Sequence, residues 1–114
     1  MDFSHDQLTT DLARYLIPIR MYPGIIQWIQ DGVKPGHFLT AIIENDLRGA
    51  IERADDENVI RLQAYIRFFY NCSPGRCWGS KELVAEWAKQ GGLRRTNFKP
   101  TLMTIDDEDI FNGE

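Results

Sequence analysis

Two cysteines and two histidines are the only side chains in this sequence suited to soft metal ligation. Cys72 and Cys77 are separated by four residues, and His5 and His37 are isolated in the sequence. A structural zinc site is typically built from closely spaced ligand pairs. A nucleophilic cysteine needs a neighbouring base and a group that orients this base. Because neither pattern is present, we predict no metal, no cofactor and no catalytic residue, and we expect a protein that is not an enzyme.

Carboxylate and amide side chains form the second group that could contact a ligand. They occur in the run Asp55–Asn58 and in the pair Asn45 and Asp46. Acids at a helix start are explained by N-capping and by the helix dipole. Asn45 and Asp46 instead fall inside a predicted helix, where both residue types have poor propensity. Asp46 is therefore either tied to a neighbouring helix or aimed at a ligand.

The third group is aromatic and basic, and it surrounds a predicted loop. Tyr70, Arg76 and Trp78 bracket the Pro74-Gly75 turn, shortly before the helix that we expect after Ser80. The N-terminus of a helix attracts anions, an arginine can hold a phosphate, and an aromatic ring can stack on a base. The alternative is that Trp78 fills the core and Arg76 is solvated.

Periodicity and capping residues predict the elements that position these groups. Apolar residues recur at three- and four-residue steps, and Ser4, Ser80, Gly32 and Gly91 are suitable helix boundaries. We expect an all-α fold, a compact bundle of about five helices with short connections. The predicted helices are His5–Leu16, a short helix from Pro23 to Gly32, Gly36–Ala54, Asp56–Tyr70 and Lys81–Gln90.

The third and fourth helices are expected to form a central long helical hairpin. The third would be roughly 28 Å long, with Glu44 and Arg48 paired four residues apart. The fourth is apolar nearly all round, and only Arg61, Gln63 and Arg67 are strongly polar in its body. Such a helix is either central in the bundle or covered by a second partner. We expect a homo-oligomer, in which another copy of the chain supplies that partner.

Length and charge limit the remaining possibilities. With 114 residues, we expect one helical domain over residues 1–104, with a partly ordered C-terminal segment that ends in an acidic mobile tail over residues 105–114. The net charge of −4 argues against nucleic acid as a partner. No apolar run approaches a membrane span and no signal peptide is apparent, so we expect a cytoplasmic protein with reduced cysteines and no membrane partner.

Several short motifs resemble a family of small, largely uncharacterised proteins of tailed phages and prophages. The resemblance covers roughly residues 22–87. It is carried by Pro35-Gly36-His37-Phe38-Leu39, Asn45-Asp46-Leu47, Ala50, Ala54-Asp55, Asn58, Tyr70-Asn71, Pro74 and Cys77-Trp78-Gly79-Ser80. It implies a phage accessory protein that acts in the bacterial host cytoplasm. Such proteins often counter host defences, by sequestering a nucleotide-type immune signal or by occluding a host defence protein.

For sequestration of a nucleotide-like small molecule, the sequence offers a set of ligand-binding residues. Asn45, Asp46 and Asp55 could bind hydroxyls, Arg48 and Arg76 could bind phosphate, and Tyr70 and Trp78 could stack. We expect Asn58 to join them at the hinge between the two hairpin helices. Two alternatives stay open: a protein–protein inhibitor or DNA mimic that uses the acids Asp106–Asp109, and a small DNA-binding phage regulator that uses Arg94, Arg95 and Lys99.

Overall fold

The computed structural model describes residues 2–94, and the regular elements in that part of the chain are all helices. The predicted all-α class is therefore confirmed. The elements are α1 (His5–Arg14), η1 (Ile19–Met21), α2 (Tyr22–Asp31), α3 (His37–Ile43), α4 (Leu47–Arg53), α5 (Asp56–Ile60), α6 (Leu62–Cys72), η2 (Gly75–Cys77) and α7 (Lys81–Gln90), where η denotes a short 3-10 helix.

Local capping chemistry sets several boundaries where the sequence predicts them. The Ser4 hydroxyl accepts a hydrogen bond from the Gln7 N–H at 3.2 Å, and the Ser80 hydroxyl accepts one from the Leu83 N–H at 3.1 Å. Gly32 ends α2 in the left-handed region, with φ of 70°. Each cap satisfies backbone groups that a helix end leaves unpaired.

The predicted continuous helix Gly36–Ala54 is wrong, because the chain turns sharply between α3 and α4. Asn45 has φ of 62°, a left-handed conformation that ends α3. Asp46 then begins α4 by accepting a hydrogen bond from the Gly49 N–H at 3.0 Å. Asparagine tolerates the left-handed region and aspartate is a preferred N-cap, so the Asn-Asp pair forms a corner.

The predicted helix Asp56–Tyr70 is also interrupted. Arg61 ends α5 and precedes α6, with φ of −100° and ψ of 14°, and α6 then extends two residues past Tyr70 to Cys72. Instead of two long helices, the central segment consists of the pairs α3/α4 and α5/α6. The expected Glu44–Arg48 pair is lost with the continuous helix. Glu44 lies 3.8 Å from the Lys34 ammonium, and the Arg48 guanidinium lies 3.2 Å from Glu52.

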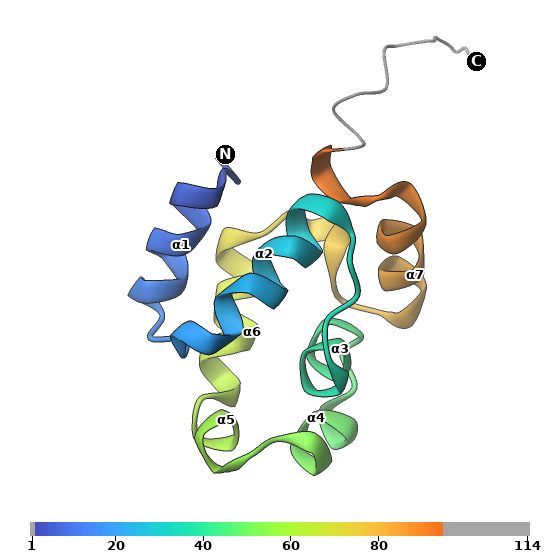
Figure 1. The fold of residues 1–114 in the computed structure, drawn as a ribbon. Helices are drawn as coiled ribbons and strands as arrows, with labels where there is room; N and C mark the ends of the chain where they lie inside the picture. Colours follow the sequence, from blue (N-terminus) through green and yellow to red (C-terminus); the bar gives the residue numbers. More distant parts are fainter. Residues whose placement is uncertain (1, 95–114) are drawn as a thin grey trace, which may run out of the picture.

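A single cluster of buried apolar side chains holds these short helices together. α1 packs against α2 and α6, and α3 packs against α4 and α6 (Figure 1). The largest fully buried side chains come from α1, α2, α3, α6, η2 and α7, and they include Leu8, Leu12, Trp28, Ile29, Ile43, Tyr65, Phe68, Phe69, Cys77 and Val84. In place of the five longer helices that the sequence predicts, the described part of the chain forms shorter helices around one core.

Some predictions concern residues outside those that the structure describes. The acidic tail 105–114 is one of them, and Arg95 and Lys99 of the proposed basic segment are others.

Candidate functional site

The side chains of the acidic hinge, which is the run Asp55–Asn58, are engaged in contacts within the chain. Asp55 accepts hydrogen bonds from the Asn58 N–H and from the Arg20 guanidinium, both at 2.8 Å. Arg20 also lies 3.1 Å from the Glu57 carboxylate. The backbone hydrogen bond from Asn58, aided by the charge of Arg20, lowers the pKa of the Asp55 carboxyl. The predicted ligand residue Asp55 thus serves as the N-cap of α5 and anchors the α1–α2 connection to the hinge.

Asn58, which the sequence offered as a ligand-binding residue at the hinge, lies in the interior. Only 4% of it is exposed, and its amide oxygen accepts a hydrogen bond from the Tyr65 hydroxyl at 2.6 Å. Burial raises the pKa of Tyr65 to about 12, so the hydroxyl stays protonated and can donate. A buried amide requires a hydrogen-bond partner. Asn58 on α5 has this partner in Tyr65 on α6, and the bond joins the two helices.

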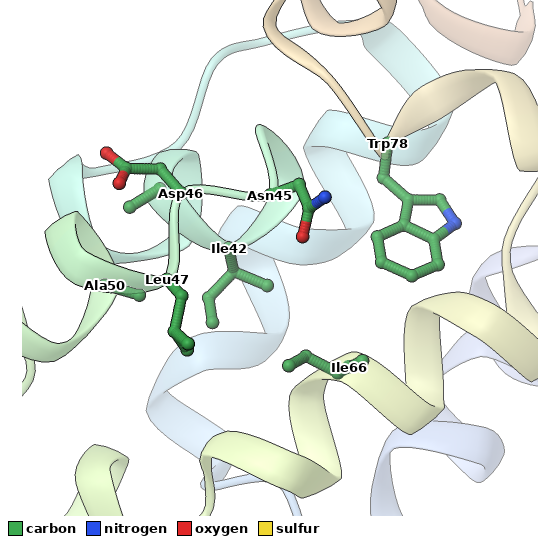
Figure 2. Close-up of a pocket in the computed structure, with 8 residues that line it drawn as sticks. Ile42, Asn45, Asp46, Leu47, Ala50, Ile66 and Trp78 are labelled. Carbon is green, nitrogen blue, oxygen red and sulfur yellow. The ribbon is translucent and has the colours of Figure 1, made fainter.

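The α3–α4 corner brings three predicted residues near a small hollow. Asn45, Asp46 and Trp78 line it together with Ile42, Ala50 and other apolar groups. Figure 2 shows the Asn45 amide and the Trp78 ring on opposite sides of the hollow, with the Asp46 carboxylate directed away from it. The volume is about 40 Å³, far below the roughly 300–1,000 Å³ of small-molecule pockets. This hollow can accept an apolar side chain but is too small for a nucleotide.

The remaining predicted residues do not converge on that hollow. Tyr70 is 77% exposed on α6, and the Arg76 guanidinium donates to the Gln90 side chain at 3.2 Å. Arg48 is engaged with Glu52 on the surface of α4. The predicted phosphate ligands Arg48 and Arg76 are thus absent from the residues that line the hollow beside Trp78.

The Cys77 thiol is deeply buried at η2. It contacts the Ser73 hydroxyl at 3.6 Å, and burial raises its pKa to about 12. The Cys72 thiol is buried as well, and its pKa is also raised by burial. Both cysteines are free. Since the thiolate is the reactive form, neither side chain is prepared for nucleophilic chemistry.

Thiol reactivity and alkaline stability should both report this burial. The native protein should resist an aromatic disulfide reagent at pH 8, whereas the urea-unfolded chain should release two equivalents of the thiol product. Folding raises the pKa of Cys77. Its contribution to the free energy of unfolding is therefore complete below about pH 9 and declines as the pH rises toward about 12. Urea titrations at pH 8 and pH 10 should show this decline, and a Cys77→Ala variant should show less of it. Rapid native labelling would contradict the assignment.

A second, larger hollow lies between the C-terminal end of α1 and the α5–α6 junction. Its volume is about 380 Å³, within the range of small-molecule sites. We call it the arginine groove. It is lined by Arg14, Tyr15, Leu16, Ile60, Arg61, Gln63, Ala64 and Arg67.

Several contacts hold the α1 wall of the arginine groove in place. The Arg14 guanidinium is paired with the buried Asp11 carboxylate and lies 5.8 Å from the centre of the Tyr15 ring. The Tyr15 hydroxyl accepts a hydrogen bond from the Asn71 amide at 3.1 Å, and its ring meets Phe68 edge-on at 6.4 Å. These contacts place an aromatic ring and one guanidinium at a defined edge of the groove.

The opposite wall carries positive charge without a matching carboxylate. Within residues 2–94, neither Arg61 nor Arg67 has an ion-pair partner within 4 Å. By contrast, Arg20 and Arg48 are both paired with carboxylates. Guanidinium groups bind phosphates and carboxylates through paired hydrogen bonds. The arginine groove is therefore the described surface best suited to an anionic ligand.

The charge pattern of the sequence contained a signal for this groove. Arg61 and Arg67 are the only strong cations in an otherwise apolar helical segment. Their distance in the sequence from Arg14 and Tyr15 conceals that the four side chains share one hollow. Leu16, with φ of 61°, turns the chain at the end of α1 and completes the wall.

No group of three or more potential metal ligands occurs among the described residues. Over residues 2–94, no helix is both long and apolar enough to cross a bilayer. Comparisons of the chain with protein-family models, with curated proteins and with solved structures found no match.

Proposed function

We propose that this protein is a non-enzymatic phage accessory protein that sequesters a nucleotide-type signal of host immunity. The observation that carries the proposal is the arginine groove, with two guanidiniums that lack a carboxylate partner among the described residues. The phage origin and the role against host defence rest on the motif resemblance. The ligand site moves from the α3–α4 corner to the groove, because the groove has the volume and the unpaired positive charge that the corner lacks.

The groove offers the two kinds of contact that a nucleotide requires. Arg61 and Arg67 can hold phosphate oxygens, while Tyr15, Leu16 and Ile60 offer aromatic and apolar surface to a base. Its lining contains no carboxylate, histidine or cysteine that could serve as a general base or nucleophile. This composition supports binding without turnover, as sequestration requires.

Self-association is part of the same proposal. Leu47 and Ile66 are exposed and line the small hollow, and Ile51 and Tyr70 are exposed on the same two helices, α4 and α6. A second copy of the chain that covered them would remove apolar surface from water. Sedimentation velocity with the Ile66→Asp variant tests this part: the native protein should sediment as an oligomer and the variant as a smaller species. A monomeric native protein would contradict it.

Ligand binding can be tested with a defined panel. Cyclic di-adenosine monophosphate, cyclic GMP–AMP and ADP-ribose serve as nucleotide probes, and inorganic phosphate and duplex DNA serve as controls. At least one nucleotide should raise the melting temperature and bind in calorimetry. The Arg61→Gln/Arg67→Gln variant should lose at least about 100-fold in affinity, because each bond to a charged group contributes about 1.5–3 kcal/mol.

A matched variant shows whether the effect is specific to the groove. Arg48→Gln/Arg53→Gln removes two guanidiniums from α4, and it should bind the nucleotide as the native protein does. Equal losses in both double variants would refute the groove as the site. A panel that gives no shift at all would refute sequestration and leave a host defence protein as the target. Salt-sensitive binding of duplex DNA would favour a DNA-binding regulator instead.

A further inference from the structure

The C-terminal segment has a pattern complementary to the arginine groove. Ile105 precedes four consecutive acids, Asp106–Asp109, and Ile110 and Phe111 follow them. The groove presents complementary features, because its lining combines arginines with the apolar side chains of Leu16 and Ile60. Leu16 is 68% exposed and Ile60 is 82% exposed, although both belong to an element boundary close to the core.

Two other arginines in the described part of the chain are already paired with acids. Arg20 is paired with Asp55 and Glu57, and Arg94 lies 3.4 Å from Asp31. Because Arg61 and Arg67 have no such partner over residues 2–94, the groove would retain its attraction for acids. Both guanidiniums line the same groove with the same charge, and an acidic partner would offset that charge.

The last described residue lies close enough for the segment to reach the groove. Arg94 lines a hollow together with His5 and Thr9, at the N-terminal half of α1. Arg14 lies five residues after Thr9 on the same helix, which is roughly 7.5 Å along its axis. The eleven residues 95–105 can span up to roughly 36–40 Å when extended. A segment of this length therefore suffices to bring the acids from Arg94 to the groove.

We infer that Ile105–Phe111 docks in the arginine groove of its own chain and competes there with the anionic ligand. The acids would pair with Arg61 and Arg67, and the flanking apolar residues would cover Leu16 and Ile60. The docking itself stands on the groove's charge and the chain length, whereas the competition rests on the function proposed above. The segment would hold the groove until a ligand of higher affinity displaced it.

Paramagnetic broadening in the full-length protein tests the docking directly. A nitroxide on Asn112→Cys should broaden the Leu16 and Ile60 methyl signals and the side-chain N–H signals of Arg61 and Arg67. The native cysteines are buried, so the unsubstituted chain treated with the same reagent is the labelling control. Broadening centred on a remote face, for example on Val33 or Leu83, would overturn the docking.

Two full-length variants establish whether charge causes the contact. One neutralises the segment, with Asp106→Asn, Asp107→Asn, Glu108→Gln and Asp109→Asn. The other removes the groove cations, with Arg61→Gln and Arg67→Gln. Both should abolish the broadening, and its persistence in either variant would overturn the inference. In mixtures of a nitroxide-labelled chain with an isotope-labelled chain, the broadening should be absent. Broadening in such a mixture would assign the contact to a second copy and overturn the inference.

The competition is measured separately, with the nucleotide that binds in the panel. A tethered segment acts at an effective concentration on the order of millimolar. Neutralising the four acids should therefore raise nucleotide affinity by about 2–10-fold. Unchanged affinity would overturn the competition while leaving sequestration intact. Docking in a protein that binds no nucleotide would support the contact and refute the proposed function.

Discussion

Replacing Gly32 by alanine is expected to lower the free energy of unfolding by about 2–5 kcal/mol. Gly32 has φ of 70°, and an added Cβ would lie 2.7 Å from the Gly92 nitrogen and 3.0 Å from the Trp87 carbonyl oxygen. These are backbone atoms, so they cannot move aside as a flexible side chain would. The left-handed conformation alone costs a non-glycine residue about 1–2 kcal/mol.

The contact is reciprocal, because the Cβ of an alanine at Gly92 would press against the backbone of Gly32 and Asp31. The ends of α2 and α7 thus meet backbone to backbone, a separation that only glycine permits. Urea denaturation followed by circular dichroism measures the loss. Gly75→Ala is the matched control, since its Cβ meets no atom within 4 Å and should change stability by less than about 1 kcal/mol. Equal effects of the two substitutions would contradict this account.

Trp28→Phe is expected to cost about 2–4 kcal/mol of stability. Trp28 is fully buried, and its indole N–H donates to the Cys77 carbonyl at 2.9 Å. Its own carbonyl accepts the indole N–H of Trp87 at 2.9 Å. Phenylalanine would leave the Cys77 carbonyl without this donor and would also leave a void beside it. Trp28 links α2 to both η2 and α7, so the loss should affect global unfolding.

A second tryptophan provides the control for this prediction. Trp78 is half-buried and lies against Phe69, with ring centres 6.0 Å apart. Trp78→Phe keeps an aromatic ring at that position and should cost less than about 1.5 kcal/mol. Circular dichroism is preferable to fluorescence, because both substitutions remove a fluorophore. A larger loss for Trp78→Phe than for Trp28→Phe would refute the role assigned to the buried hydrogen bonds.

Features that depend on a few neighbouring residues were predictable from the sequence. Ser4, Asp55 and Ser80 cap helices because their short side chains can reach an N–H within the next turn. Gly32 and Gly91 end helices because they adopt positive φ without penalty. Helical periodicity of the apolar residues also determined the all-α class, since it depends on local spacing.

The helix breaks at Asn45 and Arg61 were missed for a different reason. The apolar stripe continues in the sequence across the corner, but on α4 only Ala50 stays in the core, while Leu47 and Ile51 are exposed. The poor helix propensity of Asn45 and Asp46 was visible in the sequence, but it was equally consistent with a ligand site. The structure explains it instead by a left-handed residue followed by an N-cap.

The sequence alone therefore determined the helical class and most helix ends. It also determined that the hinge residue Asp55 caps a helix. All of these features depend on contacts within one turn. Only the tertiary structure decided that Asn58 is buried against Tyr65 and that Arg14 and Tyr15 share a hollow with Arg61 and Arg67. Those neighbours are brought together by the packing of α1 on α6. Packing across elements depends on the whole core, and the spacing of residues along the chain does not encode it.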